Sequence, residues 1–483
     1  MMDCPVALSV CMIVRNEAHQ LEEALQNFRL FADEIVVVDT GSIDETRAIA
    51  EKYAHVVADY PWHDDFSAAR NASLARARGR YLLWLDADDR VDLENVEKIR
   101  RLKTLLDGRA YCFVLKDIRH GKPFASLMQI RCVPNLPGVR FQGIIHERLD
   151  HALERLGIPL VDTDIVIEHH GYTNPYVLKS KIRRNIDLLH KAQNDCEDTQ
   201  KDETIQYYLA ISYHVLEDYE QALNCMEACL SILKKKKFCA TPTQSQALEP
   251  FIWDAVLFCA ETHLDQKNPQ KAERYLLQLN GFPCPYPYLL FRLGRLAQRL
   301  NRHKEALRYF QSVDLSRHVV TRLPWPQLNV ADLISHQAYS LYHVGGIEAC
   351  SRCVEVLQDE AVRYQVWEQL GCLAVENGQW HLASEAFHRD WGGYALSTLG
   401  WTRYGSLLKQ ENKLHLAVKA FQKALVKEPD NIEAAIKLGN TYWQLGADRR
   451  ALRVFASLVA KGVNDFPVVK AYEILSQRLG RGA

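Results

Sequence analysis

The sequence contains no apolar run long enough to cross a membrane and no secretory signal. A spanning helix needs roughly 18 or more consecutive apolar residues, and no such stretch is present. The apolar segment 7–14 has no basic segment before it and no small-residue cleavage site after it. The 13 cysteines are spaced irregularly and are too sparse, in 483 residues, for a disulfide scaffold. We therefore expect a cytoplasmic protein without a membrane span, kept in a reducing compartment.

The chain also lacks an excess of charge of either sign. Its 59 basic and 60 acidic residues give a net charge of -1, so the overall balance gives no reason to expect a nucleic-acid partner. The run Lys234–Lys237 is the one basic block, and its simplest interpretation is a solvated helix end. A chain of 483 residues is too long for one typical core, which predicts two or more domains.

Internal repetition dominates the C-terminal half. Alanines recur at a spacing of 34 residues in four of six intervals, with 50 and 43 residues in the others, and an apolar or small residue follows each alanine by four positions. A further residue, mostly Ala or Gly, precedes each alanine by 12 positions. The alanines are Ala222, Ala272, Ala306, Ala349, Ala383, Ala417 and Ala451, and the preceding residues are Ala210, Ala260, Gly294, Gln337, Gly371, Gly405 and Gly439. This period predicts stacked helix pairs.

The repeated unit resembles the tetratricopeptide repeat, most clearly over Trp401–Pro429. The resemblance implies about seven repeats over residues 201–483, with inserted loops near 236–250 and 315–330 where the interval lengthens. Such an array forms a superhelix with an extended concave face that usually binds a peptide or protein. The alternative, a purely structural or dimerising stack in a homo-oligomer, stays open.

The N-terminal half alternates apolar runs with helical stretches. The runs Leu8–Val14, Glu34–Val38 and Tyr81–Leu85 have strand length, and amphipathic segments follow the first two. Uninterrupted Val, Ile and Leu strands alternating with helices indicate a mostly parallel sheet covered on both faces. Ligands bind beyond the carboxyl ends of such strands, which directs attention to residues 15–17, 39–42 and 86–89.

Six segments appear in the order found in family-2 glycosyltransferases of the GT-A fold, and we state this as a resemblance over residues 7–190. They are 14–17, 34–46, 66–71, 85–89, 143–147 and 169–172, and a basic helix around 181–189 follows them. The resemblance implies an α/β GT-A domain, Rossmann-like and mostly parallel, over 1–175. A linking helix over 176–200 and the all-α tetratricopeptide superhelix would follow.

The same resemblance implies a donor site for a UDP-sugar. Its nucleotide-sugar contacts would be Val14, Arg15, Asn16, Glu17, Asp39, Gly41, Arg70, Asn71, Asp86 and Ala87. Asp39 is well placed for the base, although a helix cap is the alternative, and a structural salt bridge is nearly as good an interpretation of Arg70. Mn²⁺ or Mg²⁺ would be held by Asp88 and Asp86, because these ions prefer carboxylate oxygens and counter the diphosphate charge.

A late histidine would complete the metal shell. His169 is the better positional match to the family, since His170 occupies a position often held by other residues. A core histidine without a ligand is the alternative interpretation. Asp89 either joins the site or caps the turn that follows it.

An inverting transfer also needs a base that takes the proton of the acceptor. The resemblance points to Glu147, 59 residues after Asp88. His146 is the rival because imidazole titrates near neutral pH, and Asp150 is a third possibility. A glutamate bonded to backbone beneath the site is the structural alternative.

The sequence therefore predicts an enzyme, a glycosyltransferase that moves a hexose of glucose or GlcNAc type from a UDP-sugar to an acceptor held by the repeats. A peptide or protein side chain (Ser, Thr or Cys) is the first choice of acceptor. A transferase for lipopolysaccharide or another surface glycan is the second choice. A repeat adaptor with an inactive transferase domain is the alternative from a different functional class.

Overall fold

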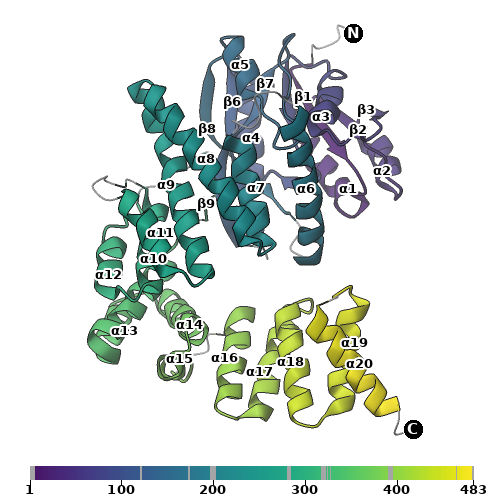
Figure 1. The fold of residues 1–483 in the computed structure, drawn as a ribbon. Coiled ribbons are helices and arrows are strands. Elements are labelled where there is room, and N and C mark those ends of the chain that lie inside the picture. The colour runs from purple at the N-terminus through teal and green to yellow at the C-terminus, as the bar shows by residue number, and fades with distance from the viewer. Residues whose placement is uncertain are drawn as a thin grey trace. The chain divides into compact units, whose positions relative to one another are not determined.

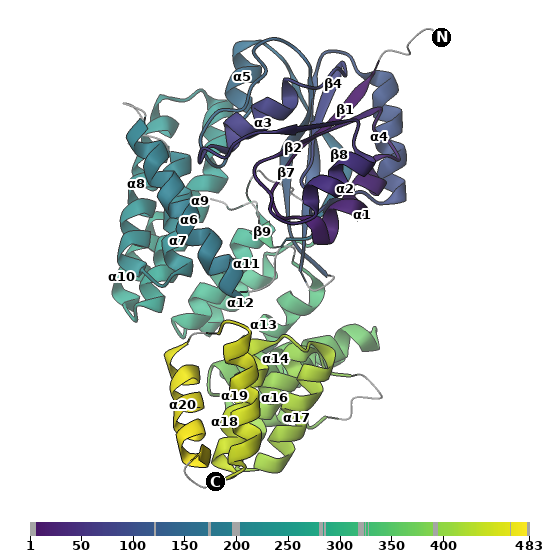
Figure 2. The ribbon, with the colours of Figure 1, turned by 90° about the vertical axis from the view of Figure 1, so that its right-hand side faces the viewer.

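The computed structural model describes residues 6–119, 122–171, 175–195, 203–279, 284, 286–316, 323, 325–326, 328–389, 395–463 and 465–480. The chain divides into two compact units, 1–282 with 318–327, and 283–317 with 328–483. Figures 1 and 2 show a sheet with flanking helices in the N-terminal part and consecutive helices from there to the C-terminus. Over the described ranges, no helix combines the length and the apolar composition that a membrane crossing requires.

A nine-stranded sheet forms the centre of the N-terminal part. Its strands are β1 (Leu8–Val14), β2 (Glu34–Asp39), β3 (Val56–Asp59), β4 (Tyr81–Trp84), β5 (Asp89–Arg90), β6 (Ala110–Arg119), β7 (Lys122–Pro134), β8 (Leu160–His169) and β9 (Trp325–Pro326). The order is β3-β2-β1-β4-β7-β6-β8-β5, and β9 pairs with β7. Strands β3, β2, β1 and β4 are parallel, whereas β7 and β5 run antiparallel to their neighbours. The four parallel strands bring the ends of β1, β2 and β4 to one edge of the sheet.

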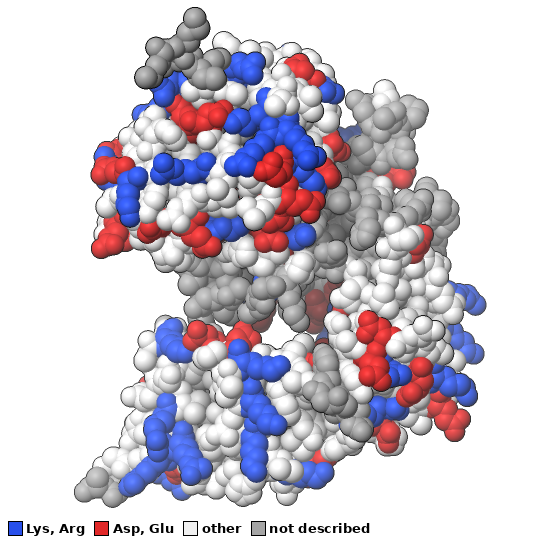
Figure 3. Space-filling view, turned by 180° about the vertical axis from the view of Figure 1, so that it is seen from behind, with Lys and Arg blue, Asp and Glu red and all other residues white. Residues whose placement is uncertain are grey.

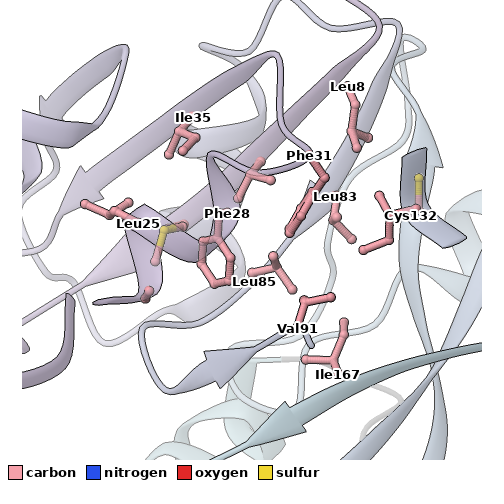
Figure 4. Packing of buried hydrophobic residues seen from close by; sticks show 14 of the residues in the cluster. Leu8, Leu25, Phe28, Phe31, Ile35, Leu83, Leu85, Val91, Cys132 and Ile167 are labelled. Atoms are coloured by element: carbon pink, nitrogen blue, oxygen red, sulfur yellow. The ribbon is translucent and has the colours of Figure 1, made fainter. Parts of the chain in front are cut away.

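Helices cover both faces of this sheet because successive side chains of a strand point to opposite faces. Val10 and Met12 of β1 belong to one apolar cluster, while Cys11 between them belongs to another. Figure 4 shows part of the first cluster, where Phe28 packs between strand residues such as Ile35 and Leu83. The helices are α1 (Ala18–Phe28), α2 (Thr46–Tyr53), α3 (Phe66–Leu74), α4 (Leu93–Leu105) and α5 (Asp150–Arg155). The predicted α/β domain is therefore confirmed.

Two helices that follow the sheet pack against a loop of the α/β domain. These are α6 (Pro175–Asp195) and α7 (Glu203–Val215), whose apolar residues form one cluster with Ile145. Within this cluster Ile186 and Leu189 of α6 and Leu209 of α7 are buried. The linking helix expected over 176–200 is α6 as far as Asp195, and 196–200 lie outside the described residues. The loop 143–147 is thus backed by helices from beyond the α/β domain.

The remaining helices form the repeat region, and the predicted all-α array is confirmed. They are α8 (Tyr219–Cys239), α9 (Pro242–Asp265), α10 (Pro269–Leu276), η2 (Leu277–Leu279), α11 (Pro287–Arg299), α12 (His303–Gln311), α13 (Val330–Glu355), α14 (Glu360–Glu376), α15 (Trp380–Phe387), α16 (Thr398–Gln410), α17 (Leu414–Lys427), α18 (Ile432–Gln444), α19 (Asp448–Ala460) and α20 (Phe466–Gly480). Consecutive helices contact each other in pairs, and α14, α16 and α18 also contact one another in succession.

Two expectations for the repeats need correction. The 50-residue interval does not contain an inserted loop at 236–250, because long helices α8 and α9 take up the added residues. In the fourth unit the register is one residue later than predicted. Ala338, Cys350 and Val354 are the fully buried residues, and the expected Gln337 and Ala349 are less buried. The kink at Gly346, whose φ is 74°, interrupts α13 between the two halves of this unit.

The glycines of the repeats make room for an aromatic ring. A Cβ atom added to Gly405 would lie 2.5 Å from the ring of Phe421, and one added to Gly439 would lie 2.8 Å from the ring of Phe455. Both rings are fully buried. The small residue and the aromatic residue 16 positions later are therefore one packing unit, which is the physical basis of the repeat pattern.

Candidate active site

The loops that follow β1 and β2 are bonded to each other. The Asn16 backbone N–H donates to Ser42 Oγ at 3.0 Å, and the Ile43 N–H donates to Asn16 Oδ1 at 2.8 Å. The Glu17 N–H donates to Thr46 Oγ1 at 2.7 Å. Asn16 adopts a left-handed conformation with φ 57°, a region that Asn tolerates better than most residues. These bonds fix the two strand-end loops side by side.

Asp39 ends β2 and is 4% exposed. Its Oδ1 accepts the backbone N–H of Gly41 at 2.9 Å and of Ser42 at 2.8 Å, which turns the chain sharply. Gly41 has φ 103°, which a residue with a Cβ rarely adopts. Val14, at the end of β1, is buried, and Arg15 after it is exposed. The carboxylate is thus held rigidly at the edge where ligands bind.

The segment 86–89 connects β4 to the short strand β5, and strand pairing brings a histidine to it. Asp89 stands opposite His169 in the antiparallel register of β5 and β8. His169 Nδ1 lies 2.9 Å from Asp89 Oδ1 and 3.4 Å from Asp88 Oδ1. His170, the neighbouring candidate, instead directs its Nε2 toward Glu168 at 3.6 Å. The structure therefore brings His169, and not His170, to the carboxylates.

Asp89 is a fully buried carboxylate with two partners of opposite charge. Arg131 Nη1 of β7 donates to its Oδ2 at 3.0 Å, and the guanidinium stacks 3.8 Å from the centre of the Trp84 ring. The Asp86 N–H also donates to Asp89 Oδ2, at 2.9 Å. Burial acts to raise the pKa of Asp89, but Arg131 and His169 outweigh it and hold the pKa below its usual value. Asp89 is an ionised anchor beneath the segment.

Asp88 lies in a different electrostatic setting. Burial raises its pKa to about 6, with the charges of Asp86 and Asp89 acting in the same direction and that of His169 against it. Burial disfavours the charged imidazole of His169, but the hydrogen bond to Asp89 and the nearby carboxylates raise its pKa to about 9. Asp86 and Asp89 are paired with Arg70 and Arg131, whereas among the ion pairs of the described residues Asp88 faces only His169. Asp88 is therefore the carboxylate whose charge a divalent cation would stabilise.

The donor set also fits a metal ion. One ligand atom each from Asp88, Asp89 and His169 lie within 4.8 Å of one another. Asp86, which the sequence paired with Asp88, is not in this group, and its Oδ1 is 3.0 Å from Arg70 Nη2. Carboxylate oxygen and imidazole nitrogen together suit Mn²⁺ or Mg²⁺. Asp88 and His169 are the residues best placed to hold such an ion, since Asp89 is bound by Arg131.

Arg70 joins the two halves of the candidate site. This buried guanidinium on α3 bonds Asp86 through Nη2 and Glu147 through Nε, and it stacks 4.4 Å from the centre of the Trp84 ring. Burial lowers the pKa of Arg70, but the two carboxylates more than reverse this effect. Burial acts to raise the pKa of Glu147, but the positive charge and the hydrogen bond of Arg70 outweigh it and lower the pKa below its usual value. Glu147 is therefore ionised and shares the guanidinium of Arg70 with Asp86.

The neighbour of Arg70 has a structural role. Asn71 Nδ2 donates to the Phe141 carbonyl at 3.0 Å, and the Phe141 N–H donates to Asn71 Oδ1 at 2.8 Å. Both polar groups of the amide are thus used to anchor the chain before the loop 143–147. The amide keeps a second N–H and a second oxygen lone pair beyond these two bonds, so the nucleotide contact of Asn71 stays a prediction. Ala87, another predicted contact, is buried, and its carbonyl accepts Arg90 Nη1 at 2.8 Å.

His146 and Glu147 point to different partners. The imidazole of His146 stacks on the Tyr208 ring of α7, with ring centres 3.4 Å apart and planes 3° from parallel. Burial lowers the pKa of His146 to about 4. Asp150, the third candidate base, is ion-paired with Arg148. Of the three, only Glu147 is bonded to the cluster around Asp86.

Cations from α6 face the same region. Burial lowers the pKa of Lys181, although the negative charges of Glu17 and Asp88 act to raise it. Burial lowers the pKa of Arg184 too, and the charge of Arg15 adds to this effect. The side chains that the sequence assigned to separate segments therefore converge on one edge with mixed charge. Tyr172, the last residue of the matched segments, lies outside the described residues.

Two of these side chains, Arg131 and Lys181, were not identified individually from the sequence. Arg131 is an arginine inside an apolar strand, and that conflict with its surroundings is a usable signal. Asp89 was noted only as a cap or a possible site residue. Lys181 was placed in a basic helix, but its proximity to Asp88 depends on how α6 packs.

Comparison with known proteins agrees with this picture. Residues 9–133 match the glycosyl transferase family 2 domain, and residues 405–446 match the TPR repeat. The chain carries a glycosyl transferase family 2 domain and a TPR repeat. The predicted resemblance to both families is thereby confirmed. The family 2 match includes Asp39, Arg70 and the whole segment 86–89, but it ends before Glu147 and His169.

Two curated relatives each match part of this chain. A TPR repeat-containing protein of Synechococcus elongatus is 37% identical over 172 residues, which are 34% of this chain and 42% of the relative. The SPbeta prophage-derived glycosyltransferase SunS of Bacillus subtilis is 27% identical over 229 residues, 46% of this chain and 53% of SunS. The chain thus spans about half the length of these curated relatives.

Solved structures with a likeness to this chain include S. aureus TarS 1-349 in complex with UDP. The TM-score is 0.34 at 16% identity, over 57% of this chain and 93% of that one. Glucosyl-3-phosphoglycerate synthase from Mycobacterium tuberculosis, in complex with Mn²⁺, UDP and glucosyl-3-phosphoglycerate, gives a TM-score of 0.29 at 18% identity, over 39% and 80% of the two chains.

Proposed function

We propose that the protein is a metal-dependent, inverting glycosyltransferase. It would move a hexose of glucose or GlcNAc type from a UDP-sugar to a side chain of a peptide or protein acceptor. The observation that carries the proposal is the pair of bonds from Arg70 to Asp86 and Glu147. They tie a carboxylate within the family 2 match to a candidate base that follows the match. The proposed domains are those expected from the sequence, 1–175, 176–200 and 201–483.

Asp39 would bind the uracil base of the donor. Its Oδ1 already accepts two backbone N–H groups, so Oδ2 is the oxygen left to accept the imide N–H. The coupled loops 15–17 and 40–43 would hold the ribose, and the carboxylate of Asp86 would accept from its hydroxyls. Rigid loops favour binding because a preformed site loses less conformational entropy when the ligand binds.

Asp88 and His169 would hold Mn²⁺ or Mg²⁺, with Asp89 orienting His169. When bound, the ion counters the charge of the diphosphate leaving group as a Lewis acid. Lys181, Arg15 and Arg184 would add positive charge on the same side, because their charges act on Asp88, Glu17 or each other. These cations would stabilise the negative charge that grows as the sugar–oxygen bond breaks.

Glu147 would take the proton from the attacking acceptor group. A general base must be deprotonated before the reaction, and Arg70 keeps Glu147 so at neutral pH. The same guanidinium fixes the position of the carboxylate relative to Asp86. His146, stacked on Tyr208, would position the loop 143–147 and would not exchange a proton.

The repeats would hold the acceptor. The first helices of successive repeats, α14, α16 and α18, contact one another and so form a continuous inner face. The combination of a family 2 domain with TPR repeats resembles the arrangement of peptide and protein glycosyltransferases, which supports a polypeptide acceptor.

Donor binding tests the first half of the proposal. UDP with Mn²⁺ should raise the melting temperature of the protein, and UDP without metal should raise it less. The variant Asp88→Asn should lose the metal-dependent part, whereas Lys304→Gln, an exposed position in α12, should keep it. Absence of any shift with UDP or ADP over a range of divalent cations would contradict donor binding.

Hydrolysis and transfer test the second half. With UDP-glucose or UDP-GlcNAc, slow donor hydrolysis should depend on metal, and a labelled sugar should appear on a polypeptide in a lysate. Glu147→Gln should bind UDP with Mn²⁺ normally but lose transfer by about a hundredfold or more, as expected for a general base. His146→Gln is the matched control and should lose less. Full transfer by Glu147→Gln would refute its role while leaving donor binding intact.

A further inference from the structure

The outer helices of the last repeats carry basic side chains that have no acidic partners. Helix α17 has Lys419, Lys423 and Lys427 and contains no Asp or Glu, and α19 has Arg449, Arg450 and Arg453. All six side chains are exposed, and none is ion-paired within the described part of the chain. We call these six residues the basic outer surface. Figure 3 shows blue side chains in columns over the C-terminal helices, with few red ones among them.

This surface is a local departure from the charge of the protein. Residues 398–480 contain 13 basic and 7 acidic residues, although the whole chain is balanced at -1. The single acidic residue of α19, Asp448, is ion-paired with Arg478 at 3.1 Å. Elsewhere in these repeats basic residues do have acidic neighbours, such as Arg403 with Glu376. The unpaired cations are therefore concentrated on two helices.

The spacing of the lysines places them in one row. Lys419, Lys423 and Lys427 follow each other by four residues, so they lie on one face of α17 with a rise of about 6 Å between neighbours. Helices α16 and α18 contact each other, and the solvent-exposed faces of α17 and α19 form the outer side of these repeats. Lys423 also contacts α16, with its Nζ 4.2 Å from the centre of the Trp401 ring. This outer side consists of helix ridges, in contrast to the inner face proposed for the acceptor.

Exposed aliphatic side chains lie on the same face of α17. Leu416 is 48% exposed and Val426 is 82% exposed. Positions 416, 419, 423 and 426 follow the three-and-four spacing of one helix face, so Leu416 and Val426 lie on either side of Lys419 and Lys423 along that face. A face that is both basic and apolar suits a boundary between charged groups and hydrocarbon, because lysine stems can lie along apolar material while the ammonium groups contact anions.

We propose that the basic outer surface binds the face of an anionic phospholipid bilayer. The phosphate groups of the lipids would pair with the six cations, and Leu416 and Val426 would enter the upper part of the acyl region. A peptide ligand would need a groove, and a nucleic acid would leave the aliphatic side chains exposed to water. The proposal does not depend on the proposed glycosyl transfer, because it uses no residue of the donor site.

Vesicle flotation with the full-length protein tests this proposal. The protein should float with vesicles of phosphatidylglycerol and phosphatidylcholine, should not float with phosphatidylcholine alone, and should be released by high salt. The triple variant Lys419→Gln, Lys423→Gln, Lys427→Gln should bind more weakly, by roughly fivefold per lysine and about a hundredfold in total. The matched control neutralises three exposed lysines elsewhere, Lys235, Lys271 and Lys304, and should bind as the unmodified protein does.

A second pair of measurements separates lipid from other anions. Leu416→Ser with Val426→Ser should weaken vesicle binding and leave the retention on a polyglutamate or polyphosphate column unchanged. Circular dichroism of each variant shows whether the repeats remain folded. The proposal is overturned if the unmodified protein fails to float with anionic vesicles, or if the α17 triple variant floats as well as the control. Retention on polyglutamate without any vesicle binding would assign the surface to an acidic protein instead, and equal vesicle binding by the serine variant would exclude insertion.

Discussion

Replacing Gly405 by alanine should destabilise the repeats although alanine is the better helix former. An alanine Cβ at this position would lie 2.5 Å from Phe421 Cε1, and the ring is fully buried, so it has no free space to move into. Overpacking of this kind costs about 1–3 kcal/mol. The higher helix propensity of alanine offsets up to about 1 kcal/mol of this cost. The net loss in the free energy of unfolding should therefore be about 1–2 kcal/mol.

A double-mutant cycle isolates the steric part of this effect. Phe421→Leu removes the ring and should cost about 1–2 kcal/mol alone, because it leaves a small cavity. In the double variant the new methyl group fills part of that cavity. The combined loss should be smaller than the sum of the single losses by at least about 1 kcal/mol, as contacting residues couple. Urea unfolding followed by the helical circular dichroism signal measures each free energy.

The other glycines provide a graded control. The added Cβ would approach the ring at 2.8 Å for Gly439 and more closely still for Gly294. Gly439→Ala should therefore destabilise less than Gly405→Ala, and Gly294→Ala should destabilise more. Additive single effects in the Gly405 and Phe421 cycle, or a Gly405→Ala variant more stable than the unmodified protein, would refute the steric explanation.

Three further predictions concern charged and titratable groups. Arg70→Met leaves the carboxylates of Asp86 and Glu147 without their shared buried partner. The free energy of unfolding, measured by urea unfolding, should therefore fall by about 3–5 kcal/mol. An unchanged urea midpoint would contradict the bridging role of Arg70. Asp88→Asn should keep or raise the melting temperature measured without metal, because it removes a carboxylate whose pKa burial has raised. The same variant should lose the added stability that Mn²⁺ with UDP gives. Retention of that added stability would exclude Asp88 as a metal ligand. Burial lowers the pKa of His336 to about 3, so the folded state binds its proton less readily than the unfolded state does. Protonation of His336 therefore favours the unfolded state, so the free energy of unfolding should be unaffected by His336 above its ordinary pKa of 6.5 and should fall as the pH drops below it. His336→Gln should flatten this decline in the urea midpoint between pH 7 and pH 4.5.

The sequence by itself determined the elements and the edge at which the site lies. The strands β1, β2 and β4 were predicted because fully buried parallel strands are continuous apolar runs. Asp39 and the segment 86–89 were located because they directly follow those runs. The repeat period was visible because each unit repeats the same local packing of a small residue against an aromatic ring. All of these signals depend on neighbours in the chain.

The tertiary structure alone decided which of two adjacent residues faces the site. His169 and His170 are the same residue type at adjacent positions. The antiparallel register of β5 with β8 places His169 opposite Asp89, which is 80 residues away in the chain. His146 and Glu147 separate because α7 supplies Tyr208 to one and α3 supplies Arg70 to the other.

The same physical reason explains the other differences from the sequence prediction. Arg131 reaches Asp89 only because β7 runs beside β4. The shift of one residue in the fourth repeat is already present at Ala338 and became visible only from the burial of Ala338, Cys350 and Val354. Periodicity records which face of an element is buried. It does not show which side chain from a distant part of the chain packs against that buried face. This pairing between distant side chains sets the charge and the orientation of each group in the site.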